Sequence, residues 1–273
     1  MSVINTNVKS IMAQNALSVN NRSLSKAMEQ LSTGKRINGA ADDAAGLAIA
    51  SKMEAQIRGL DQGVRNANDA ISMIQTAEGA TKEISNMLQR MRELSVQAAN
   101  DTYATQDRNA IGTEIDQLKE EIDRVATNSE WNGRKILGAD AGTYTYQVGS
   151  GSTSTSSVSV TFDGMSAGAL GVASLSMISY EGATSAISSV DAAIQTVDTF
   201  RATLGAKINR MESSVDNLAN ISMNTAASRS RIQDTDYAAA TTELARTQII
   251  QQAATAMLAQ ANQQPQAVLS LLR

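Results

Sequence analysis

The side chains that most often perform catalysis are missing from this sequence of 273 residues. It has no histidine and no cysteine, which removes the commonest general base, the commonest zinc ligand and the thiolate nucleophile. Two acidic clusters remain. Asp42-Asp43 is interpreted as a loop or helix start, and Glu120-Glu121, which lies among basic residues, as a charged helix face. The sequence therefore predicts that the chain is not an enzyme and holds neither a cofactor nor a metal.

A hydroxyl-rich segment follows the middle of the chain. Gly149 and Gly151 lie in it, but the Gly-Lys-Ser/Thr ending of a phosphate-binding loop is absent. The first interpretation is a flexible turn, and O-glycosylation is a second one that the sequence leaves open. The candidate acceptors are Ser150, Ser152, Thr153, Ser154, Thr155 and Ser156.

Composition and charge narrow the class of protein further. The net charge is -4 and the basic residues are scattered, so no basic patch indicates a nucleic-acid partner. No stretch has the length and apolarity of a membrane span, and Met1 to Leu31 does not resemble a cleavable signal peptide. An exported protein of this kind would need an uncleaved route. Aromatic residues make up only 3% of the chain. A composition with so few large aromatic side chains favours long contacts between helices over a thick globular core.

Four segments are expected to be helical, and the only proline, Pro265, leaves them uninterrupted. They are 7–32, which Gly34 should end, 44–99, 107–127, and a fourth that begins near Thr184 and whose pattern continues through 232 and 244 to 258. At 1.5 Å per residue the second helix would extend roughly 80 Å, which predicts a rod. The third should start at Asp107 as its N-cap and fold back antiparallel onto the second.

Two of these helices carry a coiled-coil-like repeat in which apolar residues alternate at spacings of three and four. In the second helix the repeat is Ala70, Met73, Ala77, Ala80, Ile84, Met87, Met91, Leu94 and Ala98. In the fourth it is Ile187, Val190, Ile194, Val197, Leu204, Ile208, Met211, Val215 and Leu218, with Arg201 at a position where an apolar residue is expected. Between the third and fourth helices, 143–148 and 157–162 alternate like two short strands of a hairpin. The fold class predicted is mainly α, an elongated rod of long antiparallel helices with a small β-hairpin region in the middle.

The two chain ends are adhesive in composition. Thr247 to Leu272 contains no charged residue, so a helix there has no obvious solvent face. Its large apolar residues are Ile249, Ile250, Met257, Leu258, Leu269, Leu271 and Leu272. The stripe of the first helix is Leu17, Leu24, Met28 and Leu31. Such ends should pair with each other, pack against neighbouring copies, or both. If different surfaces of each copy meet without closing a ring, the product is a helical filament, and the ends of a free monomer should be disordered until assembly.

Several motifs resemble bacterial flagellins, in family order and over nearly the whole chain. At the N-terminal end they are INTNV (4–8), LSTGKRIN (31–38), ADDAAGLAI (41–49), LQRMRELSVQ (88–97) and WNGRKIL (131–137). At the other end they are SRSRIQDTDY (228–237), LAQANQQP (258–265) and VLSLLR (268–273). The resemblance implies a secreted subunit that self-assembles into the extracellular flagellar filament for swimming motility. A hook–filament junction protein, which resembles flagellins at both ends, is the alternative.

The resemblance also implies a division of the chain. Residues 1–43 and 228–273 would form an inner terminal-helix domain, 44–137 and 182–227 the rod domain, and 138–181 a short β region in place of outer domains. The implied partners are further copies of the chain in a helical homopolymer, an export chaperone that grips about Thr241 to Arg273, and the filament cap and hook-associated proteins. Export would use the flagellar type III apparatus.

One recognition site can be carried over from the family. The vertebrate innate receptor for flagellin reads residues that match Gln89, Arg90, Leu94, Gln97 and Glu114, on a face that is buried between subunits in the filament. The alternative is purely structural, because Leu94 lies on the predicted seam and Arg90 and Glu114 would pair across two helices.

Overall fold

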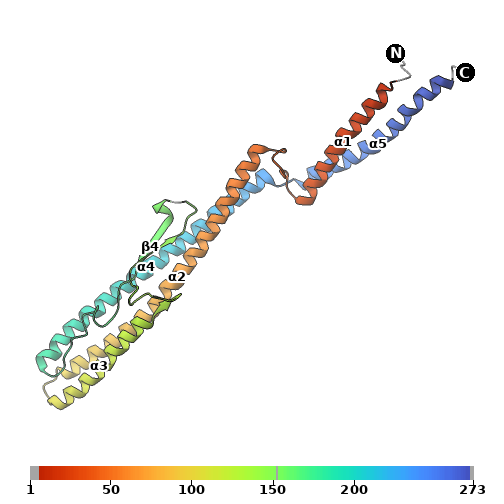
Figure 1. Cartoon of the computed structure of the whole chain (residues 1–273). Helices are drawn as coiled ribbons and strands as arrows, with labels where there is room; N and C mark the ends of the chain where they lie inside the picture. Colours follow the sequence, from red (N-terminus) through yellow and green to blue (C-terminus); the bar gives the residue numbers. More distant parts are fainter. Residues whose placement is uncertain (1–5, 152, 271–273) are drawn as a thin grey trace. The chain divides into compact units, whose positions relative to one another are not determined.

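The computed structural model describes residues 6–151 and 153–270. The chain divides into two compact units, one formed by Met1–Ala55 with Met223–Arg273 and the other by Gln56–Ser222. The predicted class is confirmed, since long helices dominate and the strands form two small antiparallel sheets (Figure 1). Two long helices, α2 (Ala44–Ala98) and α4 (Tyr180–Gln233), contribute to both units.

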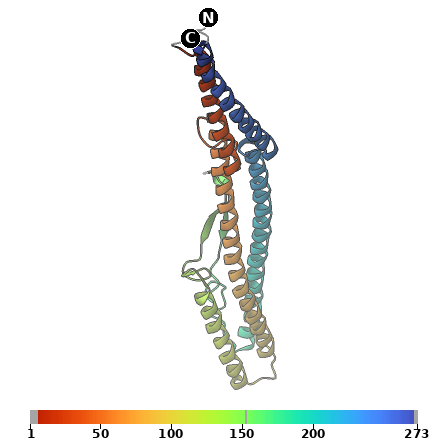
Figure 2. The same ribbon diagram turned by 90° about the vertical axis from the view of Figure 1, so that its right-hand side faces the viewer.

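The first unit is built around α1 (Val8–Thr33) and α5 (Tyr237–Ser270), which lie side by side and run in opposite directions (Figures 1 and 2). Asn7 starts α1, because its side-chain oxygen accepts the Ser10 N–H at 3.1 Å. Gly34 ends the helix with a φ of 70°, a left-handed conformation that glycine adopts at little cost. The predicted end of this helix is thus confirmed.

The second unit packs α3 (Thr105–Asn128) and α4 against α2. Arg92 on α2 and Asp191 on α4 pair at 2.6 Å, and further along Ser222 donates to Asp61 at 3.0 Å. As the residue number rises on α2 it falls on α4, so the two helices are antiparallel.

Helix α2 buries two stripes of side chains where the sequence predicts one. Most of the predicted seam is buried, but Ala80 and Met87 are only partly buried. A second set is buried as well: Ala67, Ile74, Thr81, Leu88 and Ser95. A single heptad seam suits a pair of helices. Because α2 contacts α3, α4 and the β region, it needs a wider apolar face.

The strands pack on this helical core. The predicted hairpin is present as β3 (Thr143–Gln147) and β4 (Ser157–Thr161), paired antiparallel, with a short 3₁₀ turn, η1 (Ser154–Ser156), before β4. A second, smaller hairpin that the sequence analysis missed joins β1 (Glu130–Trp131) to β2 (Arg134–Lys135). Its turn residues Asn132 and Gly133 both have positive φ, the two-residue turn that Asn-Gly favours.

Two expectations about helix ends are wrong. Asp107 is not the N-cap of α3: the helix begins after Ala104, and the Asp107 carboxylate accepts the Ala104 N–H at 3.1 Å. The fourth helical pattern is also not continuous, because α4 ends at Gln233 and α5 begins at Tyr237. Asp236 accepts the Ala238 N–H at 2.9 Å and so caps α5. Apolar periodicity runs across this break, which is why the pattern concealed it.

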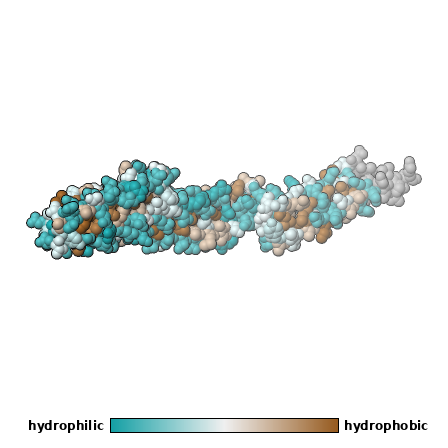
Figure 3. Space-filling view, turned by 90° about the horizontal axis from the view of Figure 1, so that it is seen from below, coloured by the Kyte–Doolittle hydropathy of each residue, from teal (hydrophilic) through white to brown (hydrophobic). Residues whose placement is uncertain are grey.

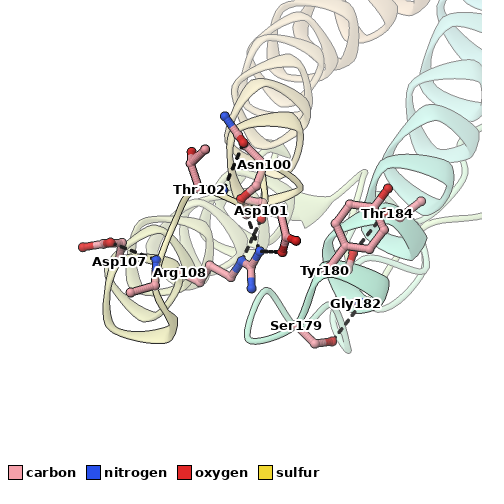
Figure 4. Close-up of polar contacts among 11 residues, drawn as sticks. Asn100, Asp101, Thr102, Asp107, Arg108, Ser179, Tyr180, Gly182 and Thr184 are labelled. Atoms are coloured by element: carbon pink, nitrogen blue, oxygen red, sulfur yellow. Dashed lines mark hydrogen bonds and ion pairs between the residues drawn. The ribbon is translucent and has the colours of Figure 1, made fainter.

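A buried arginine closes the turn between α2 and α3 (Figure 4). Arg108 Nε donates to the Ala98 carbonyl at 3.0 Å, and a terminal nitrogen of Arg108 donates to the Asn100 carbonyl at 3.2 Å and to Asp101 at 3.3 Å. The last carbonyls of a helix lack partners within it and carry partial negative charge. Arg108 therefore supplies both the missing donors and a compensating charge.

The β3–β4 hairpin lies beside α2 (Figure 2), and its closest approach is to two glycines of that helix. A Cβ atom at Gly63 would lie 2.4 Å from the Val148 carbonyl oxygen, and one at Gly59 would lie 2.8 Å from the Ser150 Cβ. One turn further, Asn66 donates to the Gln147 carbonyl at 2.8 Å. The glycines thus allow the end of β3 to approach the helix backbone.

This contact predicts opposite effects for the same substitution at two glycines of α2. Gly63→Ala forces the hairpin off the helix and should destabilise the protein by about 2 kcal/mol, the usual cost of overpacking. Gly79→Ala, where nothing lies within 4 Å, should stabilise it by about 1 kcal/mol, because alanine is the better helix former. Urea unfolding followed by circular dichroism measures both. Equal effects of the two substitutions would show that the hairpin does not depend on this approach.

Candidate assembly surfaces

The contact between α1 and α5 is made by small and polar side chains. Ala27 and Asn20 are buried on α1, and Ala240 and Thr247 are buried on α5. Among the described helices, α1 and α5 are the pair whose backbones run closest together. Small side chains allow such a close approach, which leaves little room for large apolar residues between the helices.

Three leucines of the predicted α1 stripe flank this small-residue seam. Leu17, Leu24 and Leu31 are partly buried, whereas Met28 is 56% exposed. On α5, Leu258 is partly buried. The three leucines of the predicted stripe therefore lie at the edge of the seam, and its methionine lies on the surface.

Large apolar side chains remain on the outside of the pair. They are Val8, Ile11, Met12, Val19 and Met28 on α1, and Ile249, Ile250 and Met257 on α5. Met12 and Met257 are each 67% exposed. Figure 3 shows such hydrophobic side chains among polar ones on one face of this unit. Leu269 lies within α5, and Leu271 and Leu272 lie outside the described residues. An apolar surface of this extent is typical of an interaction site.

The connections that lead out of α1 and into α5 are joined by backbone hydrogen bonds. The Arg36 N–H donates to the Gln233 carbonyl at 2.7 Å, and the Thr235 N–H donates to the Gly34 carbonyl at 3.0 Å. The Arg36 guanidinium adds a bond to the Ile232 carbonyl at 2.6 Å. The sequence analysis missed this pairing, because the two segments lie about 200 residues apart and only folding brings them together.

The five residues of the predicted recognition site lie on neighbouring turns of α2 and on α3. Arg90 donates to Glu114 at 2.9 and 3.0 Å and to Glu93 at 3.0 Å. These hydrogen bonds, with the Glu114 bond the strongest, raise the pKa of Arg90. Gln89 and Gln97 are exposed, but Leu94 is only 2% exposed and packs in the core. Four of the five are thus accessible in the single chain, and Leu94 occupies the predicted seam.

The described residues include no group of three or more His, Cys, Asp or Glu side chains placed to hold a metal ion. In the same part of the chain, no helix has the length and apolar character needed to cross a membrane.

Comparison with known proteins accounts for both halves of the chain. Residues 4–141 match the bacterial flagellin N-terminal helical region, and residues 187–272 match the bacterial flagellin C-terminal helical region. A flagellin from Halalkalibacterium halodurans is 47% identical over 99% of this chain and all of its own length, and the flagellin of Bacillus subtilis is 42% identical over 99% of both chains.

The chain belongs to the bacterial flagellin family. It is an exported structural subunit of the flagellar filament, and membership of this family implies self-polymerisation into that filament. The solved structure of Bacillus cereus flagellin has a TM-score of 0.50 at 32% identity and covers 56% of this chain and 88% of its own. A protein assigned as a flagellar hook-associated protein from Vibrio parahaemolyticus has a TM-score of 0.59 at 14% identity, which shows a shared fold alone. The junction-protein alternative is therefore not favoured.

The hydroxyl-rich segment of this flagellin is partly exposed. Ser150, Thr153 and Thr155 are exposed and Ser156 is partly buried. The Thr153 hydroxyl lies 2.9 Å from that of Thr155 and 3.2 Å from that of Ser156. Ser154 lies in the short 3₁₀ turn, and Ser152 lies outside the described residues.

The two adjacent aspartates organise the connection between α1 and α2, as the interpretation of a helix start predicts. Asp43 accepts the Gly46 N–H at 2.8 Å in the first turn of α2. Asp42 accepts from Lys26 at 2.8 Å and from the Asn38 and Gly39 N–H groups, each at 3.2 Å. The Lys26 hydrogen bond first, and then those two backbone bonds, lower the pKa of Asp42 from its usual 3.8.

This lowered pKa predicts an acid-sensitive connection. Because the pKa of Asp42 is lower in the folded state than in the unfolded state, the ionised carboxylate stabilises the fold fully at pH values above 3.8. That contribution to stability is lost as the pH falls through the lowered pKa. Asp42→Asn should therefore lower the thermal midpoint at neutral pH, and the difference from the native chain should shrink in acid. Asp163→Asn controls for the loss of one negative charge. A midpoint difference that stays constant with pH would contradict the assignment.

Proposed function

We propose that this flagellin polymerises through the unit that contains α1 and α5, and that neighbouring subunits cover its exposed apolar side chains. The observation that carries the proposal is the exposure of Ile11 and Met12 on α1 and of Ile249 and Met257 on α5. A helix pair with a thin internal seam and large apolar residues outside gains more from packing against other copies than from its own interior.

The uncharged part of α5 that begins at Thr247 supports the same role. Between Thr247 and Gln263 no residue is charged, whereas the preceding turns of α5 carry the ion pair Glu243–Arg246 and the other long helices carry pairs such as Arg92–Asp191. Covering uncharged side chains with a neighbouring subunit costs less free energy of dehydration than covering charged ones. In dilute monomer the same surface faces water, so α1 and α5 are expected to lose order until assembly.

A single charge on α5 should block polymerisation. Ile249→Glu places a carboxylate where Ile249 is 66% exposed in the single chain, and burying it between subunits without a partner costs several kcal/mol. The monomer concentration needed for polymerisation should rise by at least roughly tenfold, equivalent to about 1.4 kcal/mol. Sedimentation and electron microscopy of seeded filaments provide the measurement.

Ile249→Leu is the matched control, because it keeps an apolar side chain of the same size and should polymerise normally. Filaments of ordinary length from Ile249→Glu would overturn the proposal. The same conclusion would follow if a chain lacking Thr247 to Arg273 polymerised normally.

The remaining partners follow from the family. An export chaperone binds about Thr241 to Arg273 and covers the apolar residues of α5 before export through the type III apparatus, and the filament cap and hook-associated proteins contact the assembled subunits. Residues 1–43 with 228–273 form the inner domain, and 44–137 with 182–227 form the rod domain, with 138–181 as its β region. Ser150, Ser152, Thr153, Ser154, Thr155 and Ser156 are the candidate O-glycosylation sites.

A second role is recognition of the monomer by the vertebrate innate receptor for flagellin. It is supported by the exposure of Gln89, Arg90, Gln97 and Glu114 on adjacent helices. Arg90 and Glu114 present one positive and one negative group from two helices, held by a direct hydrogen bond of 2.9 Å. Charged pairs of this kind at an interface contribute more to specificity than to affinity.

A charge swap separates recognition from folding. Arg90→Glu combined with Glu114→Arg keeps an ion pair between α2 and α3, so the thermal midpoint should change little, but it reverses the charges that a receptor would read. Receptor activation by purified monomer should fall by roughly tenfold. The matched control is the swap Arg92→Asp with Asp191→Arg, an exposed pair between α2 and α4. Full activation by the first swap would show that Arg90 and Glu114 have a structural role only.

A further inference from the structure

One backbone carbonyl on α5 lacks the partner that a helix normally supplies. In an α-helix the N–H of each residue donates to the carbonyl four residues earlier. Helix α5 continues through position 265 to Ser270, and proline has no N–H to donate. The Ala261 carbonyl, four residues before Pro265, therefore has no donor within the helix.

A side chain from the other end of the sequence supplies this donor. Asn7 Nδ2 donates to the Ala261 carbonyl oxygen at 2.7 Å, across a separation of 254 residues. The other half of the same amide is also used, because Asn7 Oδ1 accepts the Ser10 N–H at 3.1 Å and caps α1. Serine or aspartate would cap the helix equally well. Asparagine adds the donor that reaches α5.

A hydrogen bond at a unique position matters for the register of α1 against α5, because side-chain packing alone distinguishes the native register poorly from a shifted one. Small or polar residues recur every seven positions along the seam. They are Ala13, Asn20 and Ala27 on α1, and Ala240, Thr247, Ala254 and Ala261 on α5. A shift of seven residues would place small residues opposite small residues again, so shape alone favours the native register weakly.

A hydrogen bond from a side chain to an ordinary helix carbonyl also distinguishes the registers poorly. Asn20 Nδ2 donates to the Thr247 carbonyl at 2.8 Å, and a carbonyl recurs at every helix position. The carbonyl freed by proline is different, because the chain contains one proline. After a shift of seven residues Asn7 would lie opposite Ala254, whose carbonyl has a donor within the helix, and the Ala261 carbonyl would be left without a partner. A partly buried carbonyl that loses its partner at a helix contact destabilises the arrangement.

We propose that Asn7 and Pro265 together set the register between α1 and α5. Proline creates one unpaired carbonyl in the interior of α5, before the unpaired carbonyls of its last turn, and the amide that starts α1 pairs with it. The bond also sets which exposed apolar residues of the two helices lie at the same level, and the consequence for the filament rests on the proposed role of this unit in assembly. Asn7 is a positioning residue in this account.

The register can be read by cross-linking, because the chain has no native cysteine. Ser10 Oγ lies 2.9 Å from Asn262 Oδ1, so Ser10→Cys with Asn262→Cys reports the native register. Ser10→Cys with Thr255→Cys, seven residues away, reports a shifted one. Both reporters remove the Ser10 bond, so this loss is common to every chain compared. Electrophoretic mobility separates cross-links within one chain from cross-links between chains. Both pelleted filaments and the soluble fraction are measured, so the register of a variant that fails to polymerise is still determined.

The test is a double-mutant cycle on full-length protein. Asn7→Asp keeps the acceptor that caps α1 and removes the donor, while Pro265→Ala restores the missing N–H to the Ala261 carbonyl. Each substitution should lower the ratio of native to shifted cross-links by about fivefold, the effect of one hydrogen bond of ordinary strength. The double variant should show the same ratio as the single variants, because either change alone removes the pairing.

Asn21→Asp is the matched control. It makes the same chemical change on the same helix, at a residue whose oxygen accepts from Gln251 at 3.2 Å, and aspartate keeps that acceptor. Its cross-link ratio should equal that of the native chain. The proposal is overturned if Asn7→Asp and Pro265→Ala leave the ratio unchanged, if their effects multiply in the double variant, or if Asn21→Asp lowers the ratio as much. A chain with the native cross-link ratio that still fails to polymerise would instead count against the assembly role of this unit.

Discussion

Close approach between α1 and α5 requires small residues at their contact, and this constraint decides what the rest of the first unit can do. Ala27 and Ala240 fill the seam together with the polar residues Asn20 and Thr247. Because so little apolar surface is buried inside the pair, the larger side chains are left on its outer faces. Such a helix pair gains little free energy from its own internal contact and more from burying its outer apolar side chains against further copies. The proposed self-assembly of this flagellin through α1 and α5 therefore rests on the position of these large side chains.

The second unit solves its packing differently. Helix α2 buries two stripes, with leucine, isoleucine and methionine at many positions, and it packs against two helices and a β-hairpin. Glycines at 59 and 63 allow the hairpin to approach its backbone. Arg108 closes the turn into α3 by donating to the Ala98 carbonyl at the end of α2 and to the Asn100 carbonyl in the turn. This unit has its own core, so it can keep its shape whether or not neighbours are present.

The proposed sites differ in how far the sequence could predict them. The resemblance to the family identifies exposed residues such as Arg90 and Glu114, and their pairing at 2.9 Å agrees with the structural alternative to receptor recognition. Leu94 belongs to the same motif, yet its side chain is buried, because motif membership does not distinguish a residue that contacts a partner from one that shapes the surface. The pairing of Arg36 with the Ile232 and Gln233 carbonyls was not predicted. Every residue carries a backbone carbonyl, so the residue types of a sequence do not show which carbonyl will accept such a hydrogen bond.

By itself the sequence determined the helical class, the long second and fourth helices, the central hairpin, the adhesive ends and the absence of histidine and cysteine chemistry. These features follow from local periodicity and composition, which a chain carries wherever it folds. Only the tertiary structure decided that α2 has two buried stripes, that α4 and α5 are separate helices, and that Asn7 meets Ala261. Each of these depends on contacts between segments far apart in the chain. A heptad repeat states which residues are buried in helix pairs, but it does not state how many partners a helix has or in which register they lie.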